Sequence, residues 1–213
     1  MGRCILRLQQ YELLMKGLIA NRELSGYADE LEANRVTRKK EVETKMLGQL
    51  IGELTSSCFS LSANGSQKNT KEDNSEADPK QAHVQMSYQI EMHEKDYQGT
   101  TEGLKQLVVL RNELVHHFLE RFKLRDESGC NEANAYLDDA YQMIEKHFRD
   151  LRSWMKAMEH ARKTMGELLG TSEFQSFFCM ASFLGRKLTG PTRLLSNTFL
   201  PPNMTIMKMA GQA

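Results

Sequence analysis

The residue types best suited to chemistry lie together in the middle of the chain, in the sequence Arg111-Asn112-Glu113-Leu114-Val115-His116. Histidine titrates near neutral pH and transfers protons, and arginine stays charged and binds phosphate through two hydrogen bonds. Both side chains fall within residues 104–122, whose apolar periodicity predicts a buried helix. Because burial of such groups is costly unless they are paired, this helix either pairs them internally or presents them to a partner or substrate.

The predicted helix has two apolar faces. In an α-helix each residue advances the direction of the side chain by about 100° around the axis. Measured from Leu107, a first stripe lies within about 60° and contains Leu110, Leu114 and Phe118. A second strip lies at about 60° to 120° and contains Leu104, Val108, Val115 and Leu119. We expect the first to face the core and the second to contact another copy of the chain.

The same count places Arg111 at about 40°, Asn112 at about 140° and His116 at about 180°. Arg111 and His116 of one chain are then too far apart around the helix to form a tight site. Two copies that meet across a two-fold axis would supply two arginines and two histidines to one cleft. His117 lies at about 280°, and it is a second candidate for proton transfer if the helix is distorted.

The pattern Arg111-Asn112-x-x-x-His116, late in a helix of a helical domain, resembles the Arg-x4-6-His signature of the HEPN superfamily, in which a polar residue often follows the arginine. The resemblance covers about residues 5–170, and its specific part is three residues. Many HEPN proteins are metal-independent endoribonucleases of toxin–antitoxin, phage-defence and RNA-processing systems, with this motif at a homodimer interface. The resemblance therefore implies an RNA substrate, a homodimer and an antitoxin or other protein partner.

RNA cleavage without a metal needs a base for the 2′-hydroxyl proton, an acid for the leaving 5′-oxygen and a cation for the charge on the phosphate. His116 fits the proton transfer and Arg111 fits the phosphate charge. Asn112, one helical turn before His116, fits orientation of the imidazole or contact with the phosphate. The product would be a 2′,3′-cyclic phosphate.

One HEPN toxin branch has a tyrosine two places after the histidine, which a partner nucleotidyltransferase modifies. Phe118 occupies that place here, so we expect no control by adenylylation at this position. A second resemblance involves the run from Asp96 through Tyr97 to the Arg111 motif and then residues 136–141. These segments are similar to the N-terminal regions of bacterial proteins that carry an RNA-binding LOTUS domain further along, and we expect no such domain after residue 170.

Composition limits how the chain contacts RNA. The 213 residues carry 28 basic and 28 acidic side chains, so the chain lacks the broad positive charge of a non-specific nucleic-acid binder. Any RNA contact must be local, in a small cleft or with help from a second subunit. The hydrophobic content of 40% is enough for a sizeable core.

The cysteines and histidines indicate no metal site. Four scattered cysteines, Cys4, Cys58, Cys130 and Cys179, have no Cys-x-x-Cys spacing and are typical of free cytosolic thiols. The histidines show no catalytic metal spacing, so we expect no metal or other cofactor. The N-terminus lacks a signal-peptide core and no apolar run is long enough to span a bilayer, so we expect a cytoplasmic protein.

Periodicity predicts further helices over residues 5–24, about 28–57 and about 131–169. The last contains a heptad seam that begins at Leu137 and Ala140 and ends at Met165 and Leu168. This seam serves either a helix pair within the chain or a subunit contact. His147 lies in it and is expected to be a core histidine.

Strict alternation over residues 84–92 predicts a strand, and its expected partner is residues 57–62 in an antiparallel ribbon across a mobile loop of residues 62–82. Residues 171–213 form a C-terminal tail, partly ordered or partner-binding. The sequence thus predicts a mainly α protein: a bundle of four to five helices with a small two-stranded antiparallel β-ribbon in one domain, residues 1–170. The main functional alternative to an endoribonuclease is a catalytically silent helical module that binds another protein.

Overall fold

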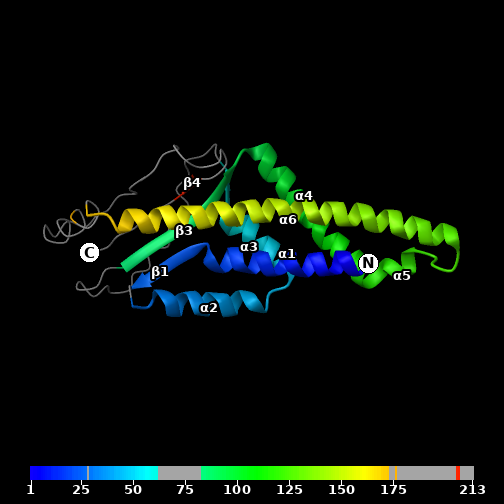
Figure 1. Cartoon of the computed structure of the whole chain (residues 1–213), viewed down its shortest axis with the longest axis horizontal. Coiled ribbons are helices and arrows are strands. Elements are labelled where there is room, and N and C mark those ends of the chain that lie inside the picture. Colours follow the sequence, from blue (N-terminus) through cyan, green and yellow to red (C-terminus); the bar gives the residue numbers. More distant parts are fainter. Residues whose placement is uncertain (28, 62–82, 173–175, 177–204, 207–213) are drawn as a thin grey trace.

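The computed structural model describes residues 1–27, 29–61, 83–172, 176 and 205–206 (Figure 1). The chain is mainly α-helical with a small mixed sheet, as the sequence predicts. The helices are α1 (Gly2–Asn21), α2 (Leu31–Glu43), α3 (Leu47–Glu53), α4 (Glu94–Asn112), α5 (Phe118–Arg121) and α6 (Glu127–Leu169), with π-helical turns η1 (Leu54–Cys58) and η2 (Glu113–His117). The strands are β1 (Glu23–Tyr27), β2 (Phe59–Leu61), β3 (His83–Met92) and β4 (Thr205–Ile206).

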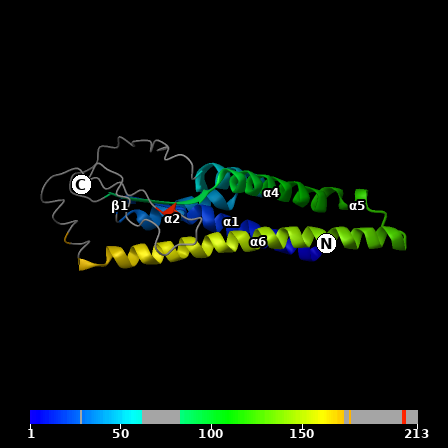
Figure 2. The ribbon, with the colours of Figure 1, turned by 90° about the horizontal axis from the view of Figure 1, so that it is seen from above.

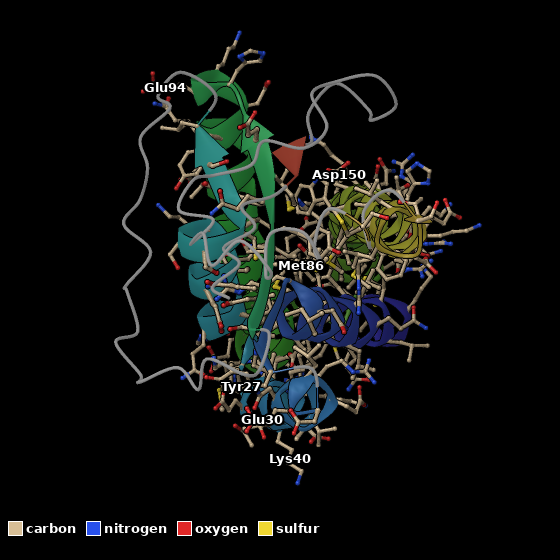
Figure 3. The ribbon with its side chains drawn as sticks, turned by 90° about the vertical axis from the view of Figure 1, so that its left-hand side faces the viewer. Tyr27, Glu30, Lys40, Met86, Glu94 and Asp150 are labelled. Atoms are coloured by element: carbon tan, nitrogen blue, oxygen red, sulfur yellow. The ribbon has the colours of Figure 1, made fainter. Side chains whose placement is uncertain are left out.

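The helices α1 and α6 run side by side in the same direction (Figures 1 and 2). Near their beginnings Arg3 is paired with Asp138 at 3.0 Å, and further along Arg162 donates to Asn21 at 3.4 Å. Helix α4 crosses α6 obliquely and runs in the opposite sense along the molecule (Figures 1 and 2). α1 lies between α6 and α2 when the molecule is viewed along its length (Figure 3).

The predicted heptad seam of α6 is confirmed as a packing surface within the chain. Its buried residues are Ala140, Ile144, Leu151, Met158, Ala161 and Met165. They belong to the buried hydrophobic residues of the chain, whose fully buried members include Tyr11, Met15, Leu50, Leu54, Leu104 and Leu107. Since this seam packs against helices of the same chain, it is not a free surface for a second subunit.

The beginning of α6 is fixed by a short segment that the sequence analysis did not identify. The Asp126 carboxylate accepts a hydrogen bond from the Gly129 N–H at 2.7 Å, which caps the helix. A Cβ on Gly129 would lie 1.9 Å from the carbonyl oxygen of Lys123, so only glycine fits there. The helix therefore starts at Glu127, earlier than the predicted residue 131.

The predicted strand at residues 84–92 is confirmed as β3, but the antiparallel ribbon is wrong. β3 pairs with β2 in parallel, with Phe59 opposite Ile90, and it pairs antiparallel with β1. A parallel pair needs a connection of a dozen or more residues, and residues 62–82 are long enough for one. β4 also pairs with β3, so the sheet order is β1-β3-β2 with β4 off this path.

Three predicted helices have different boundaries. The helix expected over residues 5–24 ends at Asn21, and the next residues form β1. The helix expected over about 28–57 is divided into α2, α3 and η1, and Met46 at the break is exposed. The helix expected over 104–122 begins at Glu94 and contains a π-helical turn. The predicted mobile loop, 62–82, and most of the predicted tail, 171–213, lie outside the described residues.

Candidate active site

The motif lies where α4 passes through the π-turn η2 into α5. Four apolar side chains, Leu110, Leu114, Phe118 and Phe122, recur at every fourth residue along this segment. In an α-helix each such step rotates the row by about 40°, so the row would turn away from the core. A π-turn has more residues per turn, so it keeps the row facing inward. Leu114 and Phe118 are indeed buried.

The π-turn also changes the angle between the candidate residues. Arg111 and His116 would be about 140° apart in a regular α-helix. Because η2 turns less per residue, the two side chains are closer around the helix than the sequence count predicts. Such turns are frequent at functional sites.

The three predicted site residues are near one another, but only two are in direct contact. Arg111 Nη1 donates a hydrogen bond to Asn112 Oδ1 at 3.2 Å. Arg111 is half-buried, whereas Asn112 and His116 are exposed. Among the residues that the structure describes, no hydrogen bond joins His116 to Arg111 or Asn112. One chain thus presents a guanidinium with its amide partner, and an imidazole beside them on the surface.

The neighbouring histidine differs from His116 in its contacts. His117 Nδ1 lies 3.1 Å from Glu120 Oε2, one helical turn later. The two imidazole rings are 6.3 Å apart between centroids. Both rings are exposed, so His117 is also accessible for proton transfer, but a carboxylate already holds it.

The predicted second apolar strip is only partly a surface feature. Leu104 is fully buried in the core, and Val108 is half-buried close to Gly48, so the prediction was wrong for these two. Val115 and Leu119 are 47% and 74% exposed, and Val109 on the preceding turns is 58% exposed. We call Val115 and Leu119, the two exposed members of the predicted strip, the apolar face of the motif helix.

A cluster next to the motif was not predicted from the sequence. The Tyr136 hydroxyl on α6 donates a hydrogen bond to the carboxylate of Glu113, the first residue of η2. Arg121 Nη1 lies 3.0 Å from the same carboxylate oxygen, and its guanidinium lies 4.5 Å from the centroid of the Tyr136 ring. Phe122 stacks at a tilt against Tyr136 with 5.2 Å between centroids. We call Glu113, Arg121 and Tyr136 the Glu113 cluster.

The Glu113 carboxylate contributes to a raised pKa of Tyr136. Burial, the hydrogen bond to Glu113 and the negative charge of that carboxylate together raise the pKa of Tyr136 to about 12. Tyr136 therefore stays protonated at neutral pH and keeps donating to Glu113. This bond could not be predicted from local pattern, because Glu113 and Tyr136 are 23 residues apart on different helices.

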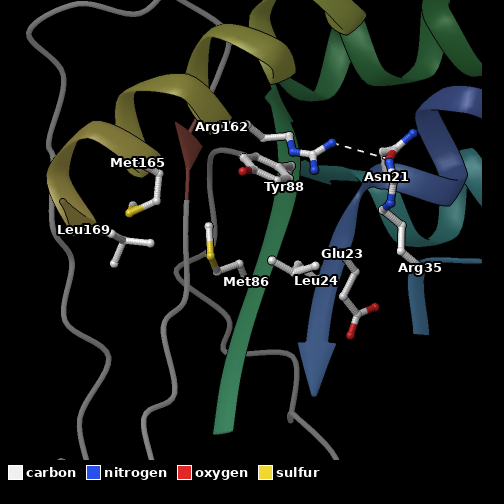
Figure 4. Close-up of a pocket in the computed structure, with 10 residues that line it drawn as sticks. Asn21, Glu23, Leu24, Arg35, Met86, Tyr88, Arg162, Met165 and Leu169 are labelled. Carbon is white, nitrogen blue, oxygen red and sulfur yellow. Dashed lines mark hydrogen bonds between the residues drawn. The ribbon is translucent and has the colours of Figure 1, made fainter. Parts of the chain in front are cut away.

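A separate cavity of about 190 Å³ lies at the other end of the molecule (Figure 4). Its apolar wall contains Leu24, Met86, Met165 and Leu169, and its polar residues include Asn21, Tyr88 and Arg162. Along α6, Arg162 is about 39 Å from Tyr136, at about 1.5 Å per residue. None of the lining residues is a histidine, so the cavity lacks the imidazole that the motif offers, and its ionisable side chains are Glu23, Arg35, Tyr88 and Arg162.

Among the described residues, no group of three or more His, Cys, Asp or Glu side chains is arranged to hold a metal ion. No helix in the described part combines the length and the apolar character that crossing a membrane requires.

Comparisons of the chain with protein-family models, with curated proteins and with solved structures found no match. The HEPN resemblance thus rests on Arg111, Asn112 and His116 and on the helix that presents them.

Proposed function

We propose that this chain is a metal-independent endoribonuclease of the HEPN type, acting in the cytoplasm in a toxin, defence or RNA-processing system. The observation that carries the proposal is the arrangement of three groups on one helix. Arg111 is held by Asn112, His116 is exposed near them, and the apolar face of the motif helix is exposed on the same segment. The pattern combines a phosphate-binding cation, a proton-transfer group and a surface for a second subunit.

The chemistry explains why two copies are needed. The 2′-oxygen of the RNA loses its proton to a base and attacks phosphorus, and the 5′-oxygen leaves with a proton from an acid. The products are a 2′,3′-cyclic phosphate and a 5′-hydroxyl end. A single base and a single acid suffice. Of the two motif histidines, His117 lies against Glu120, whereas the structure gives His116 no carboxylate contact among the described residues, so each chain supplies His116 as its proton-transfer group. A homodimer brings two such histidines to one phosphate.

Arg111 and Asn112 have different roles in this proposal. The Arg111 guanidinium neutralises the charge that builds on the phosphate oxygens in the transition state. Asn112 accepts a hydrogen bond from Arg111 and fixes its direction. The site is small, which agrees with a chain of zero net charge that can bind RNA only locally.

The alternative is a catalytically silent module that binds another protein. Its predicted binding surface, the heptad seam of α6, packs within the chain. Such a module would therefore use the apolar face of the motif helix or residues outside the described range. In that case the exposed Asn112 and His116 would be replaceable without loss of function.

The test is RNA cleavage by the purified chain and its variants. His116→Ala should lower the rate by about 10² to 10⁴, the usual contribution of general acid–base catalysis. Arg111→Ala should lower it by about 10² to 10³, as for loss of a charge-stabilising donor. His160→Ala, which removes an exposed histidine from α6, is the matched control and should keep full activity.

EDTA should have no effect on the cleavage rate, and the product should end in a cyclic phosphate. If cleavage persists in both motif variants, or if EDTA stops it, the proposed mechanism is wrong and the protein-binding module is the better explanation.

A further inference from the structure

Tyr136 contacts both ends of the π-turn η2, which follows Arg111 in the chain and contains His116. Its hydroxyl binds Glu113, the first residue of η2. Its ring lies 6.5 Å from that of Phe118, the residue that follows η2, and 5.2 Å from that of Phe122 one turn later. One side chain of α6 therefore fixes the beginning and the end of the turn.

Arg121 contacts both Glu113 and Tyr136. It pairs with Glu113 at 3.0 Å and covers the Tyr136 ring, so the carboxylate is held by one neutral and one charged donor. The Glu113 side chain is 37% exposed and that of Arg121 is 51% exposed, so water screens the ion pair. The hydrogen bond from the half-buried Tyr136 is the stronger of the two restraints, because a charged acceptor takes it in a partly dry place.

We propose that Glu113 and Tyr136 are positioning residues, which hold η2 in its π-helical form so that His116 stands at its working angle to Arg111. This inference rests on the proposed ribonuclease function. Without the bond at Glu113, only the apolar row holds the π-turn, so the segment takes regular α-helical geometry more often, and in that geometry the two side chains are about 140° apart. Neither residue touches the reacting atoms in this proposal.

The experiment compares Tyr136→Phe and Glu113→Leu with the wild-type chain, because leucine is close to glutamate in size and has no acceptor for the Tyr136 hydroxyl. Tyr136→Phe keeps the ring against Phe118 and Phe122 and removes only the hydroxyl. The matched control is Tyr141→Phe, which removes a hydroxyl from the same helix while keeping the ring that Arg3 covers at 3.9 Å. Tyr136→Phe should lower kcat by about 10- to 100-fold with little change in KM, since a small displacement of a catalytic group has effects of this size and Arg111 still binds phosphate. The kcat of the double variant should be no lower than that of the less active single variant, because both substitutions remove the same hydrogen bond.

Two readouts separate positioning from general loss of structure and from failure of the proposed function. In Tyr136→Phe the imidazole proton resonances of His116 should move in the NMR spectrum, and amide exchange should accelerate at residues 113–118 but not at 137–151. These changes are expected even if the wild-type chain cleaves no RNA, in which case the function fails and the positioning stands. Unchanged resonances and exchange in Tyr136→Phe, or equal effects in Tyr141→Phe, would overturn the inference.

Discussion

Gly103 on α4 lies directly against the imidazole of His147 on α6, and a Cβ on Gly103 would be only 2.8 Å from His147 Cε1. That distance is shorter than real carbon contacts, so the close approach of the two helices depends on glycine at this place. Because α4 ends in the motif and α6 carries Tyr136, this contact also fixes how the motif helix lies on the rest of the bundle.

Gly103→Ala should therefore destabilise the protein, even though alanine favours helix more than glycine does. The gain in helix propensity is about 1 kcal/mol, whereas forcing His147 aside costs about 1 to 3 kcal/mol. We expect a net loss of up to about 2 kcal/mol, measured by urea unfolding. Gly99→Ala on the same helix is the control, since nothing lies within 4 Å of its added Cβ and it should stabilise the chain. Equal effects of the two variants would show that His147 moves without cost.

His147 should make stability depend on pH. Burial lowers its pKa in the folded state, an effect that Lys146 strengthens and Asp150 partly offsets. The unfolded chain therefore binds a proton more readily than the folded one, so stability is complete above about pH 6.5 and falls as pH drops through the lower folded pKa. Unfolding free energies measured between pH 7.5 and 5 should show this fall, and His147→Gln should flatten it. If the unfolding free energy of His147→Gln falls with decreasing pH as steeply as that of the wild-type chain, the pH dependence comes from other groups.

The cap of α6 should also contribute measurably. Asp126→Ala removes the acceptor for the Gly129 N–H and should cost about 0.5 to 2 kcal/mol, seen as a lower Tm. Asp126→Asn is the control, because asparagine caps about as well as aspartate and should stay near wild type. If both substitutions cost the same, the charge of Asp126 matters and the cap geometry does not.

The apolar face of the motif helix should hold two chains together. Leu119 is 74% exposed, so Leu119→Glu should leave the fold intact while placing a charge in the predicted contact. Light scattering should then show a dimer for the wild-type chain and a monomer for the variant. Leu13→Glu provides the control, because Leu13 is 68% exposed on α1, far from the motif in sequence, and its variant should stay dimeric. A wild-type monomer at micromolar concentration would contradict the composite site.

The helices of this chain could be predicted from local pattern. The period of the apolar residues in α1, α4 and α6 reflects one face packed against a core, and the alternation in β3 reflects a sheet covered on one side. These signals are local, because each side chain is placed by the backbone geometry of its own element. The motif residues Arg111, Asn112 and His116 were found in the same way, from residue type and spacing.

Tertiary structure alone decided how the elements meet. β2 pairs in parallel with β3 because the long connection between them removes the constraint of a hairpin, and nothing in the alternation specifies direction. The π-turn exists because an apolar row with a period of four residues must face one core. A count of 100° per residue assumes a regular α-helix throughout, so it cannot reveal such a turn. The bond between Glu113 and Tyr136 joins helices that run in opposite directions, so it forms only when the whole bundle is packed. Local sequence thus placed the motif residues on their helix, and long-range packing set the angle between their side chains.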